Sequence, residues 1–319
     1  MRFDYIIDKI RNAEFATEPF KHLHIPDLFT PEDFREIVAA QEISLGSQAS
    51  DEALFEAMFA SGYKIIEFPG CITDRDAYLR WHKNKQPGAK FVHSACEGFG
   101  VVLRLMEARS QVINELMQFL NSAEFQQAIG DRYGVDTSGL VYDAGIQKYL
   151  DGYEISPHPD IRKKALTFLV NINPAPDSER YDHHTHYMRF RPQFDYVRSF
   201  WANNEEMDRC WVPWDWCETV ATQEHNNSLV IFAPTDDTVH AVKANYDHLT
   251  YQRTQLYGNL WHPESYTTSC PAWEDFVITE NKVGLRKRLD AFVPKPMREV
   301  ISAVRTRRDG HVEKRFYQQ

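Results

Sequence analysis

The chain has 319 residues and an ordinary globular composition, 43% hydrophobic and 26% charged, so it can bury a substantial core in one large domain or two small ones. Its formal net charge of −10 argues against a protein whose main task is to grip nucleic-acid phosphates. The sequence has no apolar run of membrane-spanning length and no apolar signal-peptide core near its start, so we expect a cytoplasmic protein that acts without a membrane.

The first third of the chain predicts helices. Residues 1–14 mix charged and apolar side chains as an amphipathic helix does, and residues 20–25 could form a short strand. Thr30, followed by a proline and two acids, is typical of a helix start. Apolar residues at helical spacing predict a helix within 98–120, and a second helix is expected over 123–133.

From about residue 139 the pattern changes to short β-rich runs separated by turn residues. Residues 165–172 alternate apolar and polar side chains, 228–232 reads as a compact apolar strand, and 249–261 is long and extended. Helices followed by many short strands favour an antiparallel sandwich or barrel over a parallel sheet.

Residues 174–223 are too long for a simple connection and too aromatic for a disordered linker. We interpret this segment as an insertion packed over one end of the barrel. Its histidine cluster (His183, His184 and His186) could hold a second metal ion, but a solvent-facing or substrate-lining loop is the preferred interpretation. The basic tail after residue 296 is interpreted as a solvated helix face.

Two histidines and an aspartate form the candidate metal site. In His158-Pro159-Asp160 an imidazole and a carboxylate stand two positions apart, and the prolines keep the backbone extended, so both side chains point to the same side. His240 follows another predicted strand and could complete the set. Two imidazoles and one carboxylate leave three open positions on an octahedral ion, which suits Fe(II) that must take a bidentate co-substrate and O2. The basic run 162–164 directly after the aspartate is interpreted as surface.

Arg253 is the candidate partner for that co-substrate. A 2-oxoglutarate molecule that chelates iron extends its far carboxylate into the barrel, and a guanidinium offers this buried anion two parallel hydrogen bonds. Tyr251 and Tyr257 share a face with Arg253 on the extended segment, which predicts an aromatic-lined interior. A structural salt bridge is the alternative role for Arg253.

Several segments match one enzyme family in their order and residue types. They are residues 145–160, residues 164–173, residues 228–234, His240-Ala-Val and Arg253. Together they resemble the prolyl-4-hydroxylase-like branch of the 2-oxoglutarate/Fe(II)-dependent oxygenase superfamily. The resemblance covers residues 139–262 and rests on motif order.

The resemblance implies an α+β chain with a mainly β core, a double-stranded β-helix (jelly roll, cupin-like) on which N-terminal helices pack. It implies a single oxygenase domain over 1–319, with mainly helical support at 1–138, the core and its insertion at 139–262, and a C-terminal extension at 263–319. It also implies that Tyr149 hydrogen-bonds 2-oxoglutarate, with a purely structural tyrosine as the alternative. Relatives carry a basic residue closer to the second histidine, so Lys243 is an alternative to Arg253.

The chemistry implied by the resemblance uses Fe(II), 2-oxoglutarate and O2, with ascorbate as a candidate reductant. 2-Oxoglutarate is decarboxylated to succinate while an aliphatic carbon of a small or carrier-linked metabolite is hydroxylated. Halogenating relatives lack the acid at the position of Asp160, so hydroxylation or desaturation is expected. The alternatives are a cupin-like metal-binding isomerase or binding protein, which would not need Arg253, and a hydroxylase of a protein side chain. The sequence leaves the substrate and the oligomeric state open.

Overall fold

The computed structural model describes residues 1–85, 95–205, 207 and 210–263. Its helices are α1 (Tyr5–Asn12), α2 (Pro31–Ala39), α3 (Asp51–Ala60), α4 (Arg75–Lys83), α5 (Gln111–Leu120), α6 (Ala123–Tyr133) and α7 (Tyr196–Ala202), with 3-10 turns η1 (Ser178–Arg180), η2 (Pro192–Phe194) and η3 (Trp214–Trp216). Its strands are β1 (Phe15–Ala16), β2 (His22–Ile25), β3 (Tyr63–Ile65), β4 (Val102–Leu105), β5 (Val141–Tyr149), β6 (Glu154–His158), β7 (Lys164–Asn171), β8 (Thr185–Phe190), β9 (Cys217–Thr222), β10 (Leu229–Phe232), β11 (His240–Lys243) and β12 (Arg253–Trp261). Each helix in these ranges is too short or too polar to span a bilayer.

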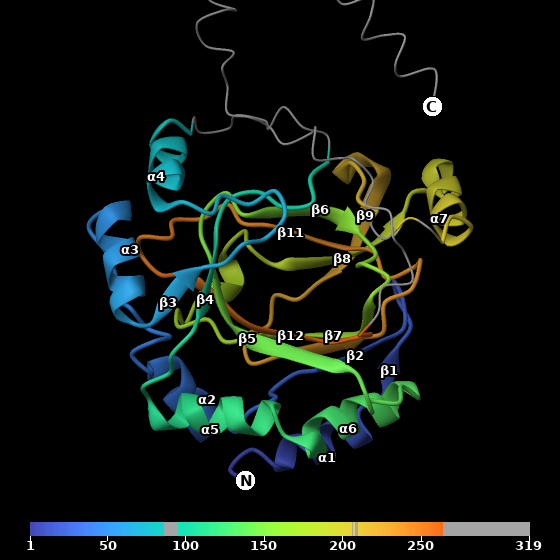
Figure 1. The fold of residues 1–319 in the computed structure, drawn as a ribbon, viewed down its shortest axis with the longest axis horizontal. Coiled ribbons are helices and arrows are strands. Elements are labelled where there is room, and N and C mark those ends of the chain that lie inside the picture. Colours follow the sequence, from blue (N-terminus) through green and yellow to red (C-terminus); the bar gives the residue numbers. More distant parts are fainter. Residues whose placement is uncertain (86–94, 206, 208–209, 264–319) are drawn as a thin grey trace, which may run out of the picture. The chain divides into compact units, whose positions relative to one another are not determined.

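The strands of the described residues form two sheets in which all neighbours are antiparallel. The larger sheet has the order β1-β2-β10-β7-β12-β5-β4-β3, and the smaller has the order β6-β11-β8-β9. Figure 1 shows β6, β11 and β8 of the smaller sheet lying across from β12 and β7 of the larger one. The predicted mixture of N-terminal helices with an antiparallel β core is confirmed.

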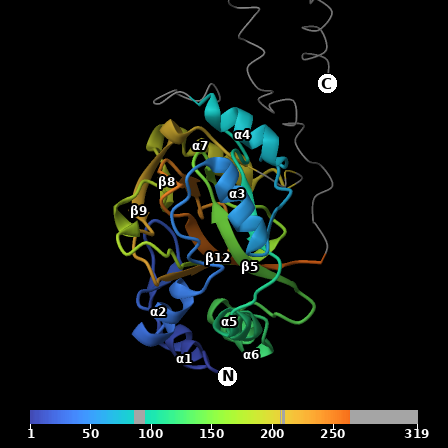
Figure 2. The same cartoon turned by 90° about the vertical axis from the view of Figure 1, so that its left-hand side faces the viewer.

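Helices α1, α2, α5 and α6 gather at one face of the larger sheet (Figures 1 and 2). The alternation of β7 explains this arrangement. Leu166, Phe168 and Val170 join the hydrophobic core that also contains the buried faces of these helices. Thr167 and Asn171 point the other way and are buried as well, because they face the space between the two sheets. A buried polar face requires partners, and those partners include the candidate site described below.

The ends of α2 and α6 follow from local sequence. Thr30 accepts a hydrogen bond from the backbone N–H of Asp33 at the start of α2, as its position before proline predicts. Ser122 accepts the equivalent bond at the start of α6, and Gly134 ends that helix with a φ of 65°, where glycine avoids the strain of a side chain. The helix predicted over 123–133 is confirmed.

The prediction of one helix within 98–120 is wrong in its first half. Residues Val102–Leu105 form strand β4, which pairs with β5 and β3, and only Gln111–Leu120 is helical. Val101, Val102 and Leu103 are all buried, which is the continuous apolar run of a strand covered on both faces. Helical spacing of a few apolar residues in this run was therefore coincidental.

The segment 174–223 is not only a cover over the core. It contains β8 and β9, and β8 pairs directly with β11, the strand that begins at His240. The part between these strands, including α7, and the part before β8, including η1, belong to neither sheet. The expectation of a loop at the histidine cluster is wrong for His186, which lies in β8. The basic tail after residue 296 lies outside the described residues.

Candidate functional site

Strand pairing brings the three predicted metal ligands together. His158 ends β6 and His240 begins β11, and the two residues face each other across the antiparallel ladder. Asp160, two residues after His158, has a φ of 72°. This is a left-handed conformation that aspartate tolerates better than most residues. Thr238 donates its hydroxyl to the carbonyl of Pro159 at 2.9 Å, which ties the two ligand-bearing segments to each other.

The side chains converge on one point. Nε2 of His158 lies 3.7 Å from Oδ1 of Asp160, and Nε2 of His240 lies 3.9 Å from Oδ2. One candidate ligand atom from each residue lies within 4.8 Å of the others, so a single ion placed between them could contact all three.

The hydrogen bonds of the two imidazoles determine which nitrogen can bind a metal. Nδ1 of His158 lies 2.9 Å from the carbonyl of Ser156, and Nδ1 of His240 lies 2.8 Å from the carbonyl of Thr238. A carbonyl can only accept, so both Nδ1 atoms carry the proton and both Nε2 atoms present a lone pair toward Asp160. Burial, reinforced by the neighbouring His158, lowers the pKa of His240 to about 3, which keeps this ring neutral at physiological pH.

Asp160 supplies the negative charge of the cluster. It is buried, and its Oδ1 lies 2.5 Å from Nζ of Lys164, while its Oδ2 accepts a 2.8 Å hydrogen bond from Thr167. Burial alone would raise the pKa of this carboxyl, but the neighbouring charge of Lys164 is the largest opposing cause, and the pKa is held well below the usual range. The site therefore combines two imidazole lone pairs with one carboxylate, which is the donor set that non-haem Fe(II) accepts with open positions left over.

A second cluster, Asp51, His82 and His248, has comparable spacing but different hydrogen bonding. His248 accepts the backbone N–H of Asp151 at Nδ1, so its Nε2 carries a proton, which it donates to Asp51 at 2.7 Å. His82 donates to Asp51 from Nδ1 at 2.6 Å and to Asp151 from Nε2 at 3.0 Å. Neither ring has a lone pair left for a metal at this point, so the cluster is an ion-pair network that links α3, α4 and two turns.

Arg253 lies in the same space between the sheets without an acidic partner. It is 3% exposed, its Nη2 donates to the hydroxyl of Thr185 at 3.1 Å, and its Cζ stands 4.6 Å above the ring of Tyr149. Over the ranges that the structure describes, no carboxylate forms an ion pair with this guanidinium. Burial accordingly lowers its pKa. A buried cation without a counter-charge is costly, and an anionic ligand would remove that cost.

Tyr149 is the cross-strand neighbour of Arg253 in the β5–β12 ladder. Its hydroxyl donates to Oε1 of Gln147 at 2.5 Å, so the tyrosine stands beside the guanidinium with its hydroxyl held by the same strand. Lys243 is placed differently: its side chain is 43% exposed and pairs with Glu154 at 3.2 Å. The buried position of Arg253 therefore favours it over Lys243 as the partner of an interior carboxylate.

The histidines of residues 183–186 do not form a second metal group with each other. His183 is buried with Nε2 at 2.6 Å from the hydroxyl of Tyr251, and His186 places Nδ1 at 3.0 Å from the hydroxyl of Thr219. Within the described ranges, the two groups with metal-binding spacing include neither of them. Nδ1 of His183 is buried without a hydrogen-bond partner in the described part of the chain. Burial, followed by the charge of Arg253, lowers the pKa of this histidine.

Sequence reasoning missed Lys164 by assigning it to the surface. Its side chain is 8% exposed and contacts both Asp160 and the hydroxyl of Tyr257. Strict alternation would put Lys164 on the helix-covered face with Leu166, but the register between β7 and β12 shifts between Leu260 and Trp261. This irregularity turns the lysine to the inner face. Alternation of residue types could not reveal it.

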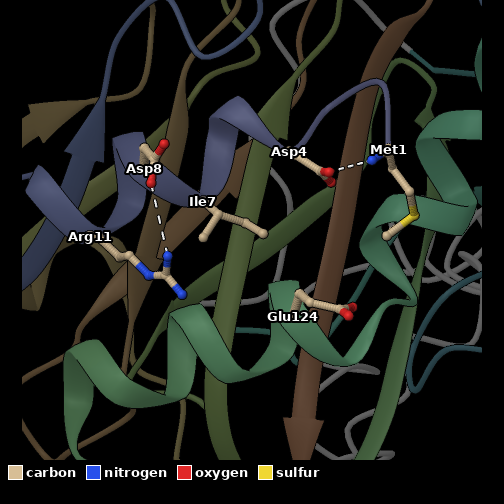
Figure 3. Close-up of a pocket in the computed structure, with 6 residues that line it drawn as sticks. All are labelled: Met1, Asp4, Ile7, Asp8, Arg11 and Glu124. Atoms are coloured by element: carbon tan, nitrogen blue, oxygen red, sulfur yellow. Dashed lines mark hydrogen bonds and ion pairs between the residues drawn. The ribbon is translucent and has the colours of Figure 1, made fainter.

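A separate surface pocket of about 460 Å³ lies between α1 and α6 (Figure 3). Its lining residues are Met1, Asp4, Ile7, Asp8, Arg11 and Glu124. Two of its acids are already paired, Asp4 with the N-terminal amine and Asp8 with Arg11. None of the predicted site residues lines this pocket.

The fold and the site together define a β-rich protein with a buried group of side chains that could hold one metal ion. In the same interior lies a cation, Arg253, that forms no ion pair with any described carboxylate. No protein-family model matches the chain, and no curated protein matches it.

Solved structures similar to this chain include enzymes of one class. A prolyl-4-hydroxylase from Pseudomonas putida is 9% identical, with 82% of this chain and 100% of that chain covered and a TM-score of 0.39. A prolyl hydroxylase from Trichoplax adhaerens, in complex with a hypoxia inducible factor peptide fragment, is 10% identical over 82% and 89%, with a TM-score of 0.38. A 2OG-Fe(II) oxygenase family oxidoreductase from Burkholderia pseudomallei is 12% identical over 70% and 97%, with a TM-score of 0.30. The last of these bears the name of the superfamily that the sequence resembles.

Proposed function

We propose that this protein is a 2-oxoglutarate- and Fe(II)-dependent oxygenase that hydroxylates an aliphatic carbon of a small or carrier-linked metabolite. One observation carries the proposal. Two imidazoles, with their Nε2 lone pairs directed toward Asp160, and the carboxylate of Asp160 converge in the same buried interior as Arg253. Arg253 has no acidic partner among the described residues. A divalent ion and a dicarboxylate would satisfy both features at once.

In this proposal His158, Asp160 and His240 hold the iron through Nε2, a carboxylate oxygen and Nε2. When bound, iron, 2-oxoglutarate and O2 supply the oxidant, and 2-oxoglutarate leaves as succinate and CO2. The chain contributes the geometry. The carbonyls of Ser156 and Thr238 orient the two rings, and Thr167 orients the carboxylate from the strand that faces it.

Arg253 would bind the far carboxylate of 2-oxoglutarate through its guanidinium fork. Tyr149 would hold that guanidinium in place with its ring. Its hydroxyl is a candidate donor to the same carboxylate, for which it would turn from Gln147. Four buried tyrosines lie around the cation (Tyr149, Tyr153, Tyr187 and Tyr246). Their rings exclude water from the charge pair, which strengthens it.

Contacts across the turn after Asp160 support a covered site and a small substrate. Arg162 donates to the carbonyls of Trp201 and Met207, and its Cζ stacks 3.9 Å from the ring of Trp201. Arg198 of α7 pairs with Asp237 in the turn before β11 at 3.1 Å. We propose that this part of 174–223 acts as a lid.

We further propose that the two sheets are the two halves of a double-stranded β-helix, with residues 139–262 as its core and residues 1–138 as support in the same oxygenase domain. A cupin-like binding protein is the alternative function. It would use the metal ligands but would provide no anion to neutralise the buried charge of Arg253.

The test is anaerobic addition of Fe(II) and then 2-oxoglutarate to metal-free protein. Chelation by the 2-oxo acid gives a weak visible metal-to-ligand charge-transfer band, which we expect for the wild type and not for His158→Ala. Succinate release across a panel of small and carrier-linked metabolites then addresses the substrate, with and without ascorbate. A wild type that shows no band and no turnover of 2-oxoglutarate would contradict the proposal.

A further inference from the structure

Lys164 forms the closest charge contact of the candidate metal carboxylate. Its Nζ lies 2.5 Å from Oδ1 of Asp160 and donates to the hydroxyl of Tyr257 at 2.7 Å. The two charged side chains are 8% and 4% exposed, so water screens their attraction poorly. The aromatic rings of Tyr257 and Trp261 lie within 5.5 Å of the ammonium and add cation–π attraction.

This contact matters because Asp160 is the only anion of the cluster. The two histidines contribute lone pairs without charge when they act as ligands, so the carboxylate supplies all of the ionic attraction for a divalent ion. Lys164 already neutralises that charge and occupies one of its two oxygens. An arriving cation would have to displace the ammonium from Oδ1 or share the carboxylate with this positive charge next to it. Either route weakens binding, because the repulsion between the ammonium and a divalent ion is electrostatic and only partly screened in a buried site.

Thr167 offers an internal comparison. It contacts the other oxygen of Asp160, at 2.8 Å, with a neutral hydroxyl that also lies 3.1 Å from Oδ1 of Asn259. A neutral donor orients a ligand without repelling the metal, and removing such a donor ordinarily lowers metal affinity. The two neighbours of one carboxylate should therefore have opposite effects.

We propose that Lys164 is an internal counter-ion for Asp160 that stabilises the protein without metal and competes with a divalent ion for the carboxylate. This inference rests on the metal site of the proposed function. Lys164 thereby sets how tightly the site holds its metal. It acts through Asp160 and is a positioning residue, not a catalytic one.

The experiment measures Mn2+ binding to metal-stripped protein by calorimetry, with thermal unfolding of the same samples without metal. Lys164→Met is expected to bind Mn2+ about tenfold tighter or more and to unfold at lower temperature without metal, since it leaves the carboxylate buried without its partner. Thr167→Val is expected to bind Mn2+ about tenfold more weakly. Lys164→Arg keeps the charge and should bind Mn2+ with nearly wild-type affinity.

Lys164→Gln serves as a second neutral variant should the methionine variant fail to fold, and the same gain in affinity is expected from it. Unchanged or weaker Mn2+ binding in the neutral variants would overturn the proposal. Binding by the neutral variants but not by the wild type would support it in its strongest form. Mn2+ binding that shifts as expected in a protein that shows no band with 2-oxoglutarate would refute the proposed function while supporting the role of Lys164.

Discussion

The surroundings of Arg253 distinguish a ligand-binding role of this residue from a structural one. A structural salt bridge would give the guanidinium a protein acid, and removing the arginine would then leave that acid buried and unpaired, at a cost of about 3–5 kcal/mol. The structure instead surrounds Arg253 with tyrosines and the hydroxyl of Thr185. Its charge is therefore available to a ligand.

Arg253→Met should accordingly raise the KM for 2-oxoglutarate by about 100-fold, because a charged, buried hydrogen-bonding partner is lost. The free energy of unfolding should stay unchanged or rise, since an apolar side chain of similar length replaces an unpaired buried cation. Steady-state succinate formation and urea unfolding measure the two effects. Arg253→Lys is the matched control, which keeps the charge but loses the fork. A large loss of stability in the methionine variant would indicate a structural role.

Asp160 and Lys164 show the limit of residue patterns. The His-x-Asp spacing and the following strands were enough to predict which three side chains converge, but the extended backbone expected from the prolines does not continue to Asp160. Strand β6 ends at His158, and Asp160 has a left-handed conformation. The lysine could not be predicted in the same way. Its inward direction depends on a register shift between β7 and β12, and the sequence of neither strand alone contains that information.

At the scale of elements, the network of His82 joins parts of the chain that lead into the candidate site. His82 of α4 donates to Asp51 at the start of α3 and to Asp151 in the turn between β5 and β6. Burial lowers the pKa of His82, but the two carboxylates outweigh burial and raise it to about 9. Lys85 also pairs with Asp151, at 2.6 Å, and His248 pairs with Asp51.

The pH dependence of stability follows from these directions. A histidine with a raised pKa in the folded state stabilises fully below its unfolded pKa of about 6.5 and loses this contribution as pH rises through 9. The pKa values of Asp51 and Asp151 are lowered despite their burial, so their contribution is present above their unfolded pKa and is lost in acid. His82→Gln should therefore destabilise by about 1–2 kcal/mol near pH 6, after allowance for solvent screening.

That difference between wild type and His82→Gln should shrink progressively between pH 7 and pH 9. Urea unfolding across pH measures it. His225→Gln, which removes a half-exposed histidine near Glu179, is measured beside it as a control for the loss of a histidine outside this network. A constant difference from pH 6 to pH 9 would mean that His82 is not charged in the folded protein.

Element prediction succeeded where local signals and packing agree and failed where they diverge. The boundaries of α6 were predictable because Ser122 and Gly134 mark both ends. Strand β4 was misassigned since its apolar run is covered on both faces and carries no period of two. Strand β8 was hidden in a polar, aromatic stretch, because its inward residues Thr185 and Tyr187 are not aliphatic. Thr185 contacts Arg253, and Tyr187 packs with Phe20 and Phe232 in a small cluster.

At the scale of the molecule, the larger sheet has two different neighbours. Helices pack on one face through Leu166, Phe168 and Val170, while the other face meets the smaller sheet both through polar contacts such as Arg253 with Thr185 and through small hydrophobic clusters. Because this apolar layer stabilises the fold, the side chains of the candidate site can include buried charged and polar groups that do not themselves add to stability.

Metal binding should then be linked to global stability. Any ion that binds only the folded state stabilises it by about 2.7 kcal/mol at one hundred times its dissociation constant. Adding Mn2+ should raise the Tm of the wild type by several degrees and leave the Tm of His240→Ala unchanged, as measured by calorimetric scans. The alanine variant of His248, in the ion-pair network, is the control and should still respond to the metal. An equal response from His240→Ala would place the metal elsewhere.

The hydrogen bonds of His158 and His240 have a consequence for how the protein assembles. Each ring donates to the carbonyl two residues before it, Ser156 or Thr238, so the choice of tautomer is made within three consecutive residues. The position of the proton on each ring therefore does not depend on a contact with the opposite strand. Each short segment thus favours the tautomer that leaves Nε2 free for a metal. Changes in the chain between His158 and His240 would leave these local hydrogen bonds in place.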